Sequence, residues 1–281
     1  MTTRAGYGIV IGKLRLGYHM AAGDIRREKI VEIVKKHSGV SCADLSKIFK
    51  VTPETIRRDL EYLQDQKLLI RTHGGAIASV EAEMLPAALR KQENFEQKLA
   101  IARKASSYIS EGDVIFMDAG TTVNLICEFM PQDKEFFVVT NSKESIVKLA
   151  DVPNITLIST GGILRKKTMA FAGENAMQSL RSITFNKAFI SALAVSEKYG
   201  IMDSHSDEAN INRLALEKAI ETFLLVDATK FNKMAYINVC PIDHISTIIT
   251  DDRLSSDIHT ELEQKGLNVI ICNSSGNKPE Q

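Results

Sequence analysis

Three side chains near the start of a predicted helix have the types and spacing expected of a DNA-reading group. They are Thr55, Arg57 and Arg58. A guanidinium group can contact guanine through two hydrogen bonds or pair with a phosphate, and a threonine hydroxyl can bond a base or a phosphate. The group is therefore suited to the major groove of double-stranded DNA. The alternative is that a short amphipathic helix with two arginines is an ordinary solvated surface, because exposed arginine is common.

A second set of polar residues lies in turns that directly follow strand-like apolar runs. The set consists of Asp118, Gly120, Thr121, Thr122, Thr140, Asn141, Ser142, Gly161, Gly162, Arg165 and Lys230. Ligands of open α/β sheets bind beyond the carboxyl ends of the strands, so these turns are expected to converge on one site. Their backbone N–H groups and hydroxyls can hold a phosphate, and the two cations can pair with an anion. Together they favour a phosphorylated, polyhydroxylated ligand.

Each of these motifs also has a purely structural interpretation. Thr121 and Thr122 can cap a helix, Asn141 and Ser142 are ordinary caps, and the glycine pair can form a simple turn. Asp118 can orient sugar hydroxyls, but an aspartate at a strand end can equally accept hydrogen bonds from nearby N–H groups. The residue types therefore allow both the binding and the structural interpretation.

The sequence shows neither a metal site nor a disulfide scaffold. Its four cysteines are far apart and form no Cys-x-x-Cys pair, and its six histidines do not fall at metal-ligand spacing. No convincing acid/base pair is recognisable among the polar turns. We therefore expect no metal, no cofactor and no catalytic residues.

Charge is unevenly distributed along the 281 residues. The chain holds 35 Lys and Arg against 35 Asp and Glu, so its formal net charge is zero. Residues 1–80 hold 14 Lys and Arg against 8 Asp and Glu, a net charge of +6, which leaves a net charge of −6 for residues 81–281. A basic N-terminal part followed by an acidic C-terminal part indicates that only the N-terminal part binds a polyanion. The composition, with 44% hydrophobic residues, excludes disordered, collagen and membrane classes. Neither a membrane-spanning run nor a secretory leader is recognisable, and we expect a cytoplasmic protein.

The segment that carries the DNA-reading group is predicted to fold as three short helices. Apolar spacing from Asp24 predicts a first helix that stops before Gly39. Ser41 is a good N-cap for a second helix of about two turns. Thr52 can cap a third helix, in which Pro53 suits the first position and which runs to about residue 66. Two helices joined by a tight turn form a helix-turn-helix.

The periodicity of the third helix separates an apolar face from a polar one. At 100° per residue, Ile56, Leu60 and Leu63 share one face, while Arg58 lies almost opposite and Arg57 to one side. The apolar face must pack on the small core. The polar face is therefore predicted to point outward.

Two short β segments follow over residues 68–77, with His73, Gly74 and Gly75 at or near their connection. A hairpin after a recognition helix is the wing of a winged helix. Arg71 and His73 are then secondary candidates for DNA contact, together with Tyr62 on the third helix.

The remainder of the chain is predicted to be an α/β domain with a largely parallel sheet. After a helix that ends near residue 110, apolar strands alternate with helices. The predicted strands are 114–117, 136–139, 155–158, 188–190, 223–226, 245–249 and 269–271, and the helices include 142–149, 207–221 and 255–265. The predicted domains are an extension over 1–23, either a disordered arm or residues left by cloning; a winged helix-turn-helix over 24–78; a linker over 79–97; an effector-binding domain over 98–272; and a tail over 273–281.

These motifs, in this order, resemble those of DeoR-type bacterial transcription regulators. The signature is Ile56-Arg57-Arg58-Asp59-Leu60, preceded by Thr55 and followed by Thr72-His73-Gly74-Gly75-Ala76. The match continues through Lys98, Asp118-Ala-Gly-Thr-Thr, Thr140-Asn-Ser, Gly161-Gly-Ile-Leu-Arg165 and Asp227-Ala-Thr-Lys230-Phe231, and it covers about residues 24–272.

The resemblance implies a winged helix-turn-helix that binds operator DNA as an oligomer. It also implies a C-terminal sensor domain related to ribose-5-phosphate isomerase, which binds a phosphorylated sugar or polyol. Most members are repressors of carbohydrate-catabolic operons, and binding of the metabolite releases the repressor from its operator. One motif departs from the family: many relatives have Gly-Ala-Asp where this chain has Ser191-Ala192-Leu193. An apolar leucine can neither bond ligand hydroxyls nor move protons.

We therefore expect a transcriptional regulator that acts as a repressor. Its expected partners are double-stranded operator DNA, a phosphorylated sugar or polyol, and at least one further copy of itself, and we expect no membrane partner. The first alternative is a sugar-phosphate isomerase or deaminase with an accessory winged helix. The second is a winged helix that packs on protein instead of DNA.

Overall fold

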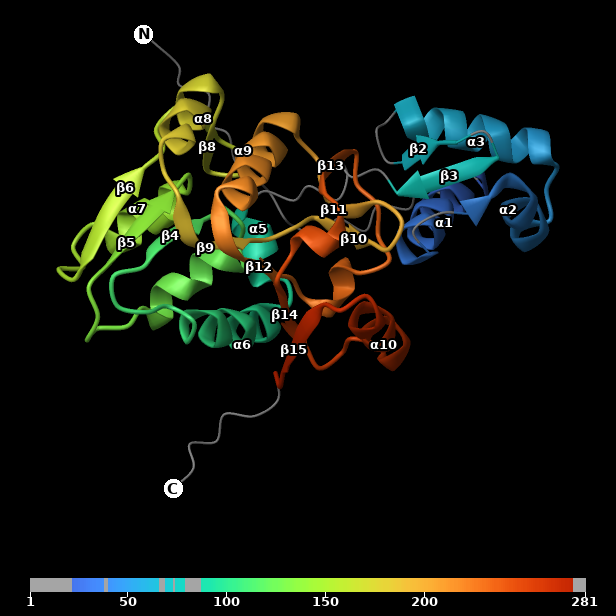
Figure 1. Cartoon of the computed structure of the whole chain (residues 1–281). Coiled ribbons are helices and arrows are strands. Elements are labelled where there is room, and N and C mark those ends of the chain that lie inside the picture. The colour runs from blue at the N-terminus through green and yellow to red at the C-terminus, as the bar shows by residue number, and fades with distance from the viewer. Residues whose placement is uncertain (1–21, 38–39, 66–68, 73, 79–86, 275–281) are drawn as a thin grey trace, which may run out of the picture. The chain divides into compact units, whose positions relative to one another are not determined.

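A computed structural model describes residues 22–37, 40–65, 69–72, 74–78 and 87–274 (Figure 1). The chain divides into two compact units, residues 1–78 and residues 79–281. Most of the predicted N-terminal extension and most of the predicted tail lie outside the described residues. The first helix begins at Ala22, two residues inside the predicted extension.

The first unit is a small winged helix-turn-helix. Its elements are α1 (Ala22–His37), β1 (Val40–Ser41), α2 (Cys42–Phe49), α3 (Pro53–Asp65), β2 (Leu69–Arg71) and β3 (Gly75–Ala78). Ser41 caps α2 by accepting a hydrogen bond from the backbone N–H of Asp44, as its position predicts. Strands β2 and β3 pair antiparallel and form the wing.

Apolar residues from all three helices and the wing share one core. Its buried members are Ile30, Val34, Leu45, Ile56, Leu60, Leu63, Leu69 and Ala76. The sequence did not reveal β1, which pairs with β3 opposite Gly75 and Ala76. This pairing brings backbone so close that a Cβ on Gly75 would lie 2.0 Å from the carbonyl oxygen of Val40. Only glycine fits there.

The second unit is built on a seven-stranded parallel sheet with strand order β15-β14-β12-β9-β4-β5-β6. The strands are β4 (Val114–Met117), β5 (Phe136–Thr140), β6 (Ile155–Ser159), β9 (Phe185–Ile190), β12 (Ala219–Leu225), β14 (Thr247–Asp251) and β15 (Asn268–Cys272). Every predicted strand is present within a few residues of its expected bounds. The α/β fold class is therefore confirmed.

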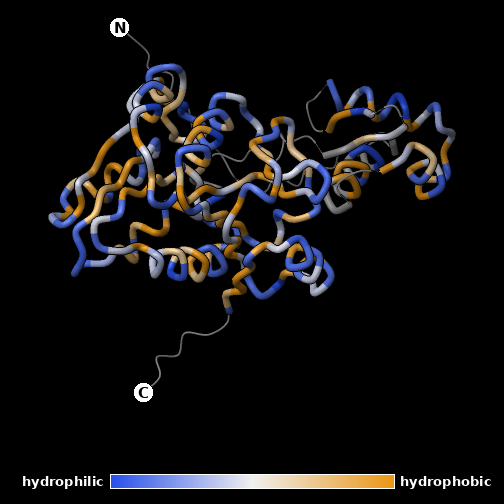
Figure 2. The backbone as a smooth tube through the Cα atoms, in the orientation of Figure 1, coloured by the Kyte–Doolittle hydropathy of each residue, from blue (hydrophilic) through white to orange (hydrophobic). Residues whose placement is uncertain are grey.

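Helices cover both faces of this sheet. They are α5 (Ala87–Gln92), α6 (Phe95–Ser106), η1 (Val123–Phe129), α7 (Lys143–Leu149), α8 (Glu174–Arg181), α9 (Ser206–Glu217), η2 (Ala228–Lys230), η3 (Ile242–His244) and α10 (Ser256–Gln264). Helix α6 packs with Ile115 and Met117 on one face, and α8 and α9 pack with Phe116 and Ala188 on the other. Figure 2 shows the apolar residues along the strands, as expected for a sheet buried on both faces.

Two small antiparallel sheets supplement the parallel one. They are formed by β7 (Ile163–Arg165) with β8 (Ala170–Ala172), and by β10 (Ala194–Ser196), β11 (Gly200–Asp203) and β13 (Ile237–Cys240). Periodicity did not predict these strands, because each has only three or four residues.

Three predicted boundaries differ from the structure. The helix expected over 207–221 ends at Glu217, because residues from Ala219 onward pair with β9 instead. The turn at 118–122 leads into a 3₁₀ helix, in which the N–H of Leu125 bonds the carbonyl of Thr122. Residues 87–97, expected as linker, carry α5 and the start of α6.

Candidate functional site

The structure places the exposed side of α3 as the sequence predicts. Ile56, Leu60 and Leu63 are buried, whereas the side chains of Arg57 and Arg58 are 59% and 78% exposed. Both arginines lie near Glu54 on the same helix, with N···O distances of 3.4 and 3.7 Å. Ion pairs this exposed contribute little and are easily exchanged. The two guanidinium groups are therefore available to an anionic partner.

The other predicted DNA contacts lie beside this face. The hydroxyl of Thr55 contacts that of Thr52 at 2.9 Å. The ring of Tyr62, which is exposed, lies under the guanidinium of Arg27 at 4.2 Å. Arg71 is on the wing strand β2, and its backbone N–H bonds the side chain of Gln64 on α3. His73 lies outside the described residues.

Asp59 is a residue of α3 that the helical wheel did not single out. Its carboxylate is 2% exposed and accepts hydrogen bonds from Arg26 Nε at 2.6 Å and Arg27 Nε at 2.9 Å. It therefore fastens α3 to α1 through two charge-assisted hydrogen bonds. An aspartate between two apolar positions of a helix is the sequence signal that could have found it.

A pocket opens in the second unit at the point where the strand order reverses. Strand β4 has β5 on one side and β9 on the other, and the chain proceeds outward from this centre in both directions. Such a switch point is where ligands of open α/β sheets bind. The pocket is lined by Arg90, Asp118, Ala119, Gly120, Asn141, Thr168, Ala170, Ser191, Ala192, Leu193, Asp203, Ser204, Glu208 and Asn212.

The turn after β4 is organised by Asp118. Its carboxylate accepts hydrogen bonds from the backbone N–H groups of Gly120 at 2.7 Å and Ser191 at 2.9 Å, and from the side chain of Asn212. Burial raises the pKa of Asp118. Gly120 is required here, because a Cβ would lie 1.7 Å from the hydroxyl oxygen of Ser191. The structural and binding interpretations of Asp118 thus coexist, since it shapes the turn and also faces the pocket.

Hydrogen-bond acceptors dominate the pocket wall. Asn141 and Asn212 are buried, and among the described residues neither side-chain carbonyl oxygen has a hydrogen-bond partner. A buried acceptor without a donor is costly, so both oxygens favour a ligand that supplies O–H or N–H groups. Burial, with the nearby charge of Glu208, raises the pKa of Asp203 to about 7.

Glu208 links the β7–β8 hairpin to α9. Its carboxylate accepts hydrogen bonds from Arg165 Nε at 2.8 Å and from the Thr168 hydroxyl at 2.7 Å. Arg165 therefore acts behind the pocket, through Glu208, instead of lining it. The hairpin is further held by the N–H of Phe171, which bonds the carbonyl of Asn141 at 2.7 Å.

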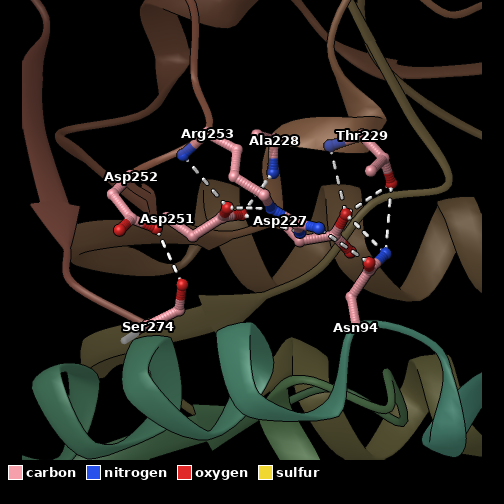
Figure 3. Close-up of polar contacts among 8 residues, drawn as sticks. All are labelled: Asn94, Asp227, Ala228, Thr229, Asp251, Asp252, Arg253 and Ser274. Carbon is pink, nitrogen blue, oxygen red and sulfur yellow. Dashed lines mark hydrogen bonds and ion pairs between the residues drawn. The ribbon is translucent and has the colours of Figure 1, made fainter. Parts of the chain in front are cut away.

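A second polar cluster lies where β12 and β14 end (Figure 3). The side chain of Asn94, at the start of α6, donates to Asp227 at 3.1 Å and accepts from Arg253 at 3.1 Å. Arg253 in turn pairs with Asp251 at 2.6 Å. This network ties the start of α6 to the carboxyl end of the sheet.

Two lysines, Lys98 and Lys230, lie near Asp227. Lys98 on α6 is 3% exposed, and its ammonium donates to the carbonyl oxygen of Arg90. Burial lowers its pKa to about 8 and also lowers the pKa of Lys230, while the charge of Asp227 opposes both shifts. The structure thus brings Arg90, Lys98 and Lys230 into one cationic region.

Only three of the predicted effector residues line the pocket: Asp118, Gly120 and Asn141. Thr140 donates to the carbonyl of Met117, and Ser142 caps α7, so both serve the fold. The remaining candidates, Thr121, Thr122, Gly161, Gly162, Arg165 and Lys230, lie outside the lining. The lining residues that sequence reasoning missed include Arg90, Asp203, Glu208 and Asn212, none of which directly follows a strand of the parallel sheet.

Comparison with known proteins identifies the family. A model of the DeoR-like helix-turn-helix domain matches residues 26–81, and a model of the DeoR C terminal sensor domain matches residues 93–252. The chain belongs to the DeoR family of transcriptional regulators. The resemblance found in the sequence is therefore confirmed.

DeoR-family relatives align with this chain over nearly their whole length. The uncharacterized HTH-type transcriptional regulator YulB of Bacillus subtilis is 37% identical over 87% of this chain and 95% of its own. HTH-type transcriptional regulator GlpR of Haloferax volcanii is 34% identical over 87% and 96%. The lactose phosphotransferase system repressor of Lactococcus lactis is 37% identical over 85% and 95%. These relatives are regulators, which confirms the expectation of a regulator instead of an enzyme.

Among solved structures, ribose 5-phosphate isomerase A of Methanocaldococcus jannaschii matches with a TM-score of 0.38 and 21% identity, over 50% of this chain and 56% of that one. A likeness this distant says nothing about chemistry. No helix in the described part of the chain is long and apolar enough to cross a membrane.

Proposed function

We propose that this DeoR-family regulator is a repressor of a carbohydrate-utilisation operon and that a phosphorylated sugar or polyol, bound in the pocket between β4 and β9, modulates its operator binding. The observation that carries the proposal is the chemistry of the pocket wall. Carbonyl oxygens of Asn141 and Asn212 and carboxyl groups of Asp118 and Asp203 are suited to accept hydrogen bonds from ligand hydroxyls. A sugar or polyol presents several such donors on one small molecule.

A cation in the same wall supports the phosphate half of the proposal. Arg90 is the arginine that lines the pocket, and Lys98 donates to its backbone carbonyl. A guanidinium group binds a phosphate through two parallel hydrogen bonds. The names of two relatives, the lactose phosphotransferase system repressor and the transcriptional regulator GlpR, agree with a role in regulation and, for the first, with repression of a sugar system.

For operator binding, we propose Thr55, Arg57 and Arg58 as the principal contacts and Tyr62, Arg71 and His73 as secondary ones. The exposure of Arg57 and Arg58 on α3, away from its buried leucines, supports this assignment. One short helix reads too few base pairs for useful specificity, so at least two copies of the chain are expected on a two-fold symmetric site.

The test begins with selection of binding sites from a pool of random duplexes by the purified full-length protein. The selected duplex is then titrated with ribose 5-phosphate, glucose 6-phosphate, fructose 1-phosphate and glycerol 3-phosphate, each beside its unphosphorylated counterpart. We expect one phosphorylated compound to change operator affinity and raise the melting temperature, while its counterpart does neither. Failure to select any duplex, or an equal response to both partners of every pair, would refute the proposal.

A further inference from the structure

The wall of the pocket carries more negative groups than positive ones. Among the described residues that line it, three have a carboxyl group and one is a cation; they are Asp118, Asp203, Glu208 and Arg90. Glu208 is paired from behind the pocket, because Arg165 Nε lies 2.8 Å from its carboxylate. Asp118 and Asp203 therefore share the single cation of the described lining.

The hydroxyl groups of the wall are already directed to these carboxylates. The hydroxyl of Ser191 donates to Asp118 at 3.2 Å, and that of Ser204 donates to Asp203 at 3.4 Å. The hydroxyl of Thr168 likewise donates to a carboxylate. A hydroxyl group has only one O–H to donate. These three hydroxyls therefore offer a ligand oxygen atoms that accept, and no free O–H.

Asn141 and Asn212 add two further acceptors to the wall. The two residues are only 2% and 4% exposed. The side-chain nitrogen of Asn141 donates to the carbonyl of Phe171 at 3.3 Å, and that of Asn212 donates to Asp118 at 3.4 Å. Their side-chain oxygens have no partner among the described residues, and a buried oxygen without a donor is costly. Independently of the carboxyl groups, they indicate an occupant that donates hydrogen bonds.

The carboxyl group of Asp203 shows that this wall is short of positive charge. Burial, then the charges of Glu208 and Asp118, raise its pKa to about 7, and the charge of Arg90 opposes them. These groups face Asp203 from α9, from the turn after β4 and from α5. A further cation placed among them would be attracted by all three carboxyl groups.

A protonated amine matches such a wall better than a hydroxyl group does. A hydroxyl brings one donor and no charge, and its oxygen needs donors in turn. An ammonium group brings three donors and a positive charge, and it needs no donor. Hydrogen bonds in which one partner is ionised are also roughly twice as strong as neutral ones. The excess of accepting oxygens therefore favours an amine.

The dimensions of the pocket favour a small group at the wall. Only about 40 Å³ of the pocket is wide enough for water-sized groups, whereas the space among the lining residues, with the open mouth included, is about 500 Å³. The wide part has the size at which pockets hold small molecules. The narrow part has room for an ammonium group, but an acetylated amine is larger and carries no charge.

We propose that the effector is a phosphorylated amino sugar, and that Asp203 binds its protonated amine with the side-chain oxygens of Asn141 and Asn212 as further acceptors. This inference rests on the proposed function, because it names the class of sugar phosphate that the same pocket takes. It makes the amine the group that distinguishes the effector from other sugar phosphates.

Matched pairs of ligands test the amine in the full-length protein with its selected duplex. Glucosamine 6-phosphate is compared with glucose 6-phosphate, and galactosamine 6-phosphate with galactose 6-phosphate. In at least one pair, we expect the amino compound to change operator binding and raise the melting temperature at a concentration at least about tenfold lower than its hydroxyl counterpart. N-acetylglucosamine 6-phosphate, which has no charge on its nitrogen, should act no better than glucose 6-phosphate.

Asp203→Asn tests the binding group, because it keeps the shape of the side chain and removes its charge. We expect this variant to require at least about tenfold more of the amino compound for the same change in operator binding. The concentration required of the hydroxyl counterpart should change little. Asp257→Asn, at an exposed position of α10, is the control and should match wild type with both compounds.

The outcomes separate this inference from the proposed function. If a sugar phosphate without an amine acts on wild type at the same or a lower concentration than both amino compounds, the inference is overturned and the proposed function stands. The same holds if Asp203→Asn weakens the response to both members of a pair equally. If no phosphorylated compound, with or without an amine, affects the melting temperature or operator binding of wild type, the proposed function fails and the inference falls with it.

Discussion

At the scale of single residues, Arg58 and Asp59 are neighbours in sequence with opposite environments. The side chain of Arg58 is 78% exposed on α3, and that of Asp59 is 2% exposed beneath it. One is placed to meet a partner and the other holds the helix against α1. Substituting each should therefore affect different measurements.

Arg58→Ala should weaken operator binding without affecting folding. Loss of one base-contacting arginine costs about 1–3 kcal/mol of specific binding, or roughly fivefold to more than a hundredfold in affinity. Because the side chain is 78% exposed and its ion pair with Glu54 is a surface one, the melting temperature should change little. Mobility shifts with the selected duplex measure the first effect and circular dichroism the second. Near-wild-type affinity would show that α3 presents a different face to DNA; Arg181→Ala is the control.

Asp59→Asn should destabilise the winged helix. It removes the charge that Arg26 and Arg27 share while keeping the shape of the side chain. Breaking a buried ion pair costs about 3–5 kcal/mol, and the partial exposure of both arginines reduces the expected loss to about 1–3 kcal/mol. Urea unfolding measures it, with exposed Glu61→Gln as control. Equal stability of the two variants would contradict the role assigned to Asp59.

Asp203 should make stability depend on pH. Its pKa is about 7 in the folded chain, above the ordinary aspartate value of 3.8, so between these pH values the folded chain holds a proton that the unfolded chain releases. The free energy of unfolding therefore falls as pH rises from about 4 to about 7 and changes no further above that. Asp203→Asn cannot titrate. Relative to wild type, its free energy of unfolding should rise by at least about 1 kcal/mol between pH 5 and pH 8.

Unfolding by urea at both pH values compares wild type, Asp203→Asn and Asp257→Asn. Asp257 is exposed on α10 and serves as the control. A pH-independent difference between wild type and Asp203→Asn would contradict the environment described for this carboxyl group.

At the scale of elements, the β7–β8 hairpin depends on Gly162. Its φ is +103°, and a Cβ would lie 2.6 Å from the carbonyl oxygen of Ala172 across the hairpin. The adjacent Gly161 has φ of +62° and open space around it. Gly162→Ala should therefore cost about 2–3 kcal/mol and Gly161→Ala about 1 kcal/mol. Denaturant unfolding measures the free energy of unfolding of both variants, and equal losses would argue against the described turn.

The sequence predicted those elements whose side chains follow a single period. The strands of the parallel sheet are continuous apolar runs, and the buried face of α3 follows the helical repeat. Strand β1 has two residues, and β7 and β8 have three each, too few to establish a period. Their positions depend on pairing with distant segments.

Only some of the residues that line the pocket were predicted, because only some of them have a local signal in the sequence. Asp118 and Asn141 directly follow apolar strands of the parallel sheet, so the rule for strand ends found them. Arg90 comes from α5, and Asp203 is the last residue of the short antiparallel strand β11, so neither has a local signal. Thr140 satisfied the rule, yet its hydroxyl is consumed by the carbonyl of Met117. Residue type at a strand end does not distinguish a binding group from one that serves the fold.

At the scale of the whole molecule, opposite charge on the two parts favours binding of DNA by the first alone. Residues 1–80 carry +6 and the rest −6. Phosphate contacts release counterions, so the logarithm of operator affinity should fall linearly with the logarithm of salt concentration. Arg57→Gln should reduce this slope by about 1 if Arg57 contacts phosphate. Fluorescence anisotropy over a range of salt concentrations measures it; an unchanged slope would exclude that contact.

The symmetry of the operator tests how many copies of the chain act together. Two winged helices related by a two-fold axis contact half-sites whose centres lie about 10–10.5 base pairs apart, or a multiple of that spacing. The selected duplexes should therefore contain an inverted repeat. A duplex with one half scrambled should bind at least about tenfold more weakly, because it keeps the phosphate contacts of both copies and loses the base contacts of one. Sedimentation of the protein–DNA complex should give two copies or more per intact site. Equal affinity for intact and half-scrambled duplexes, with one copy bound, would show that a single chain reads the operator.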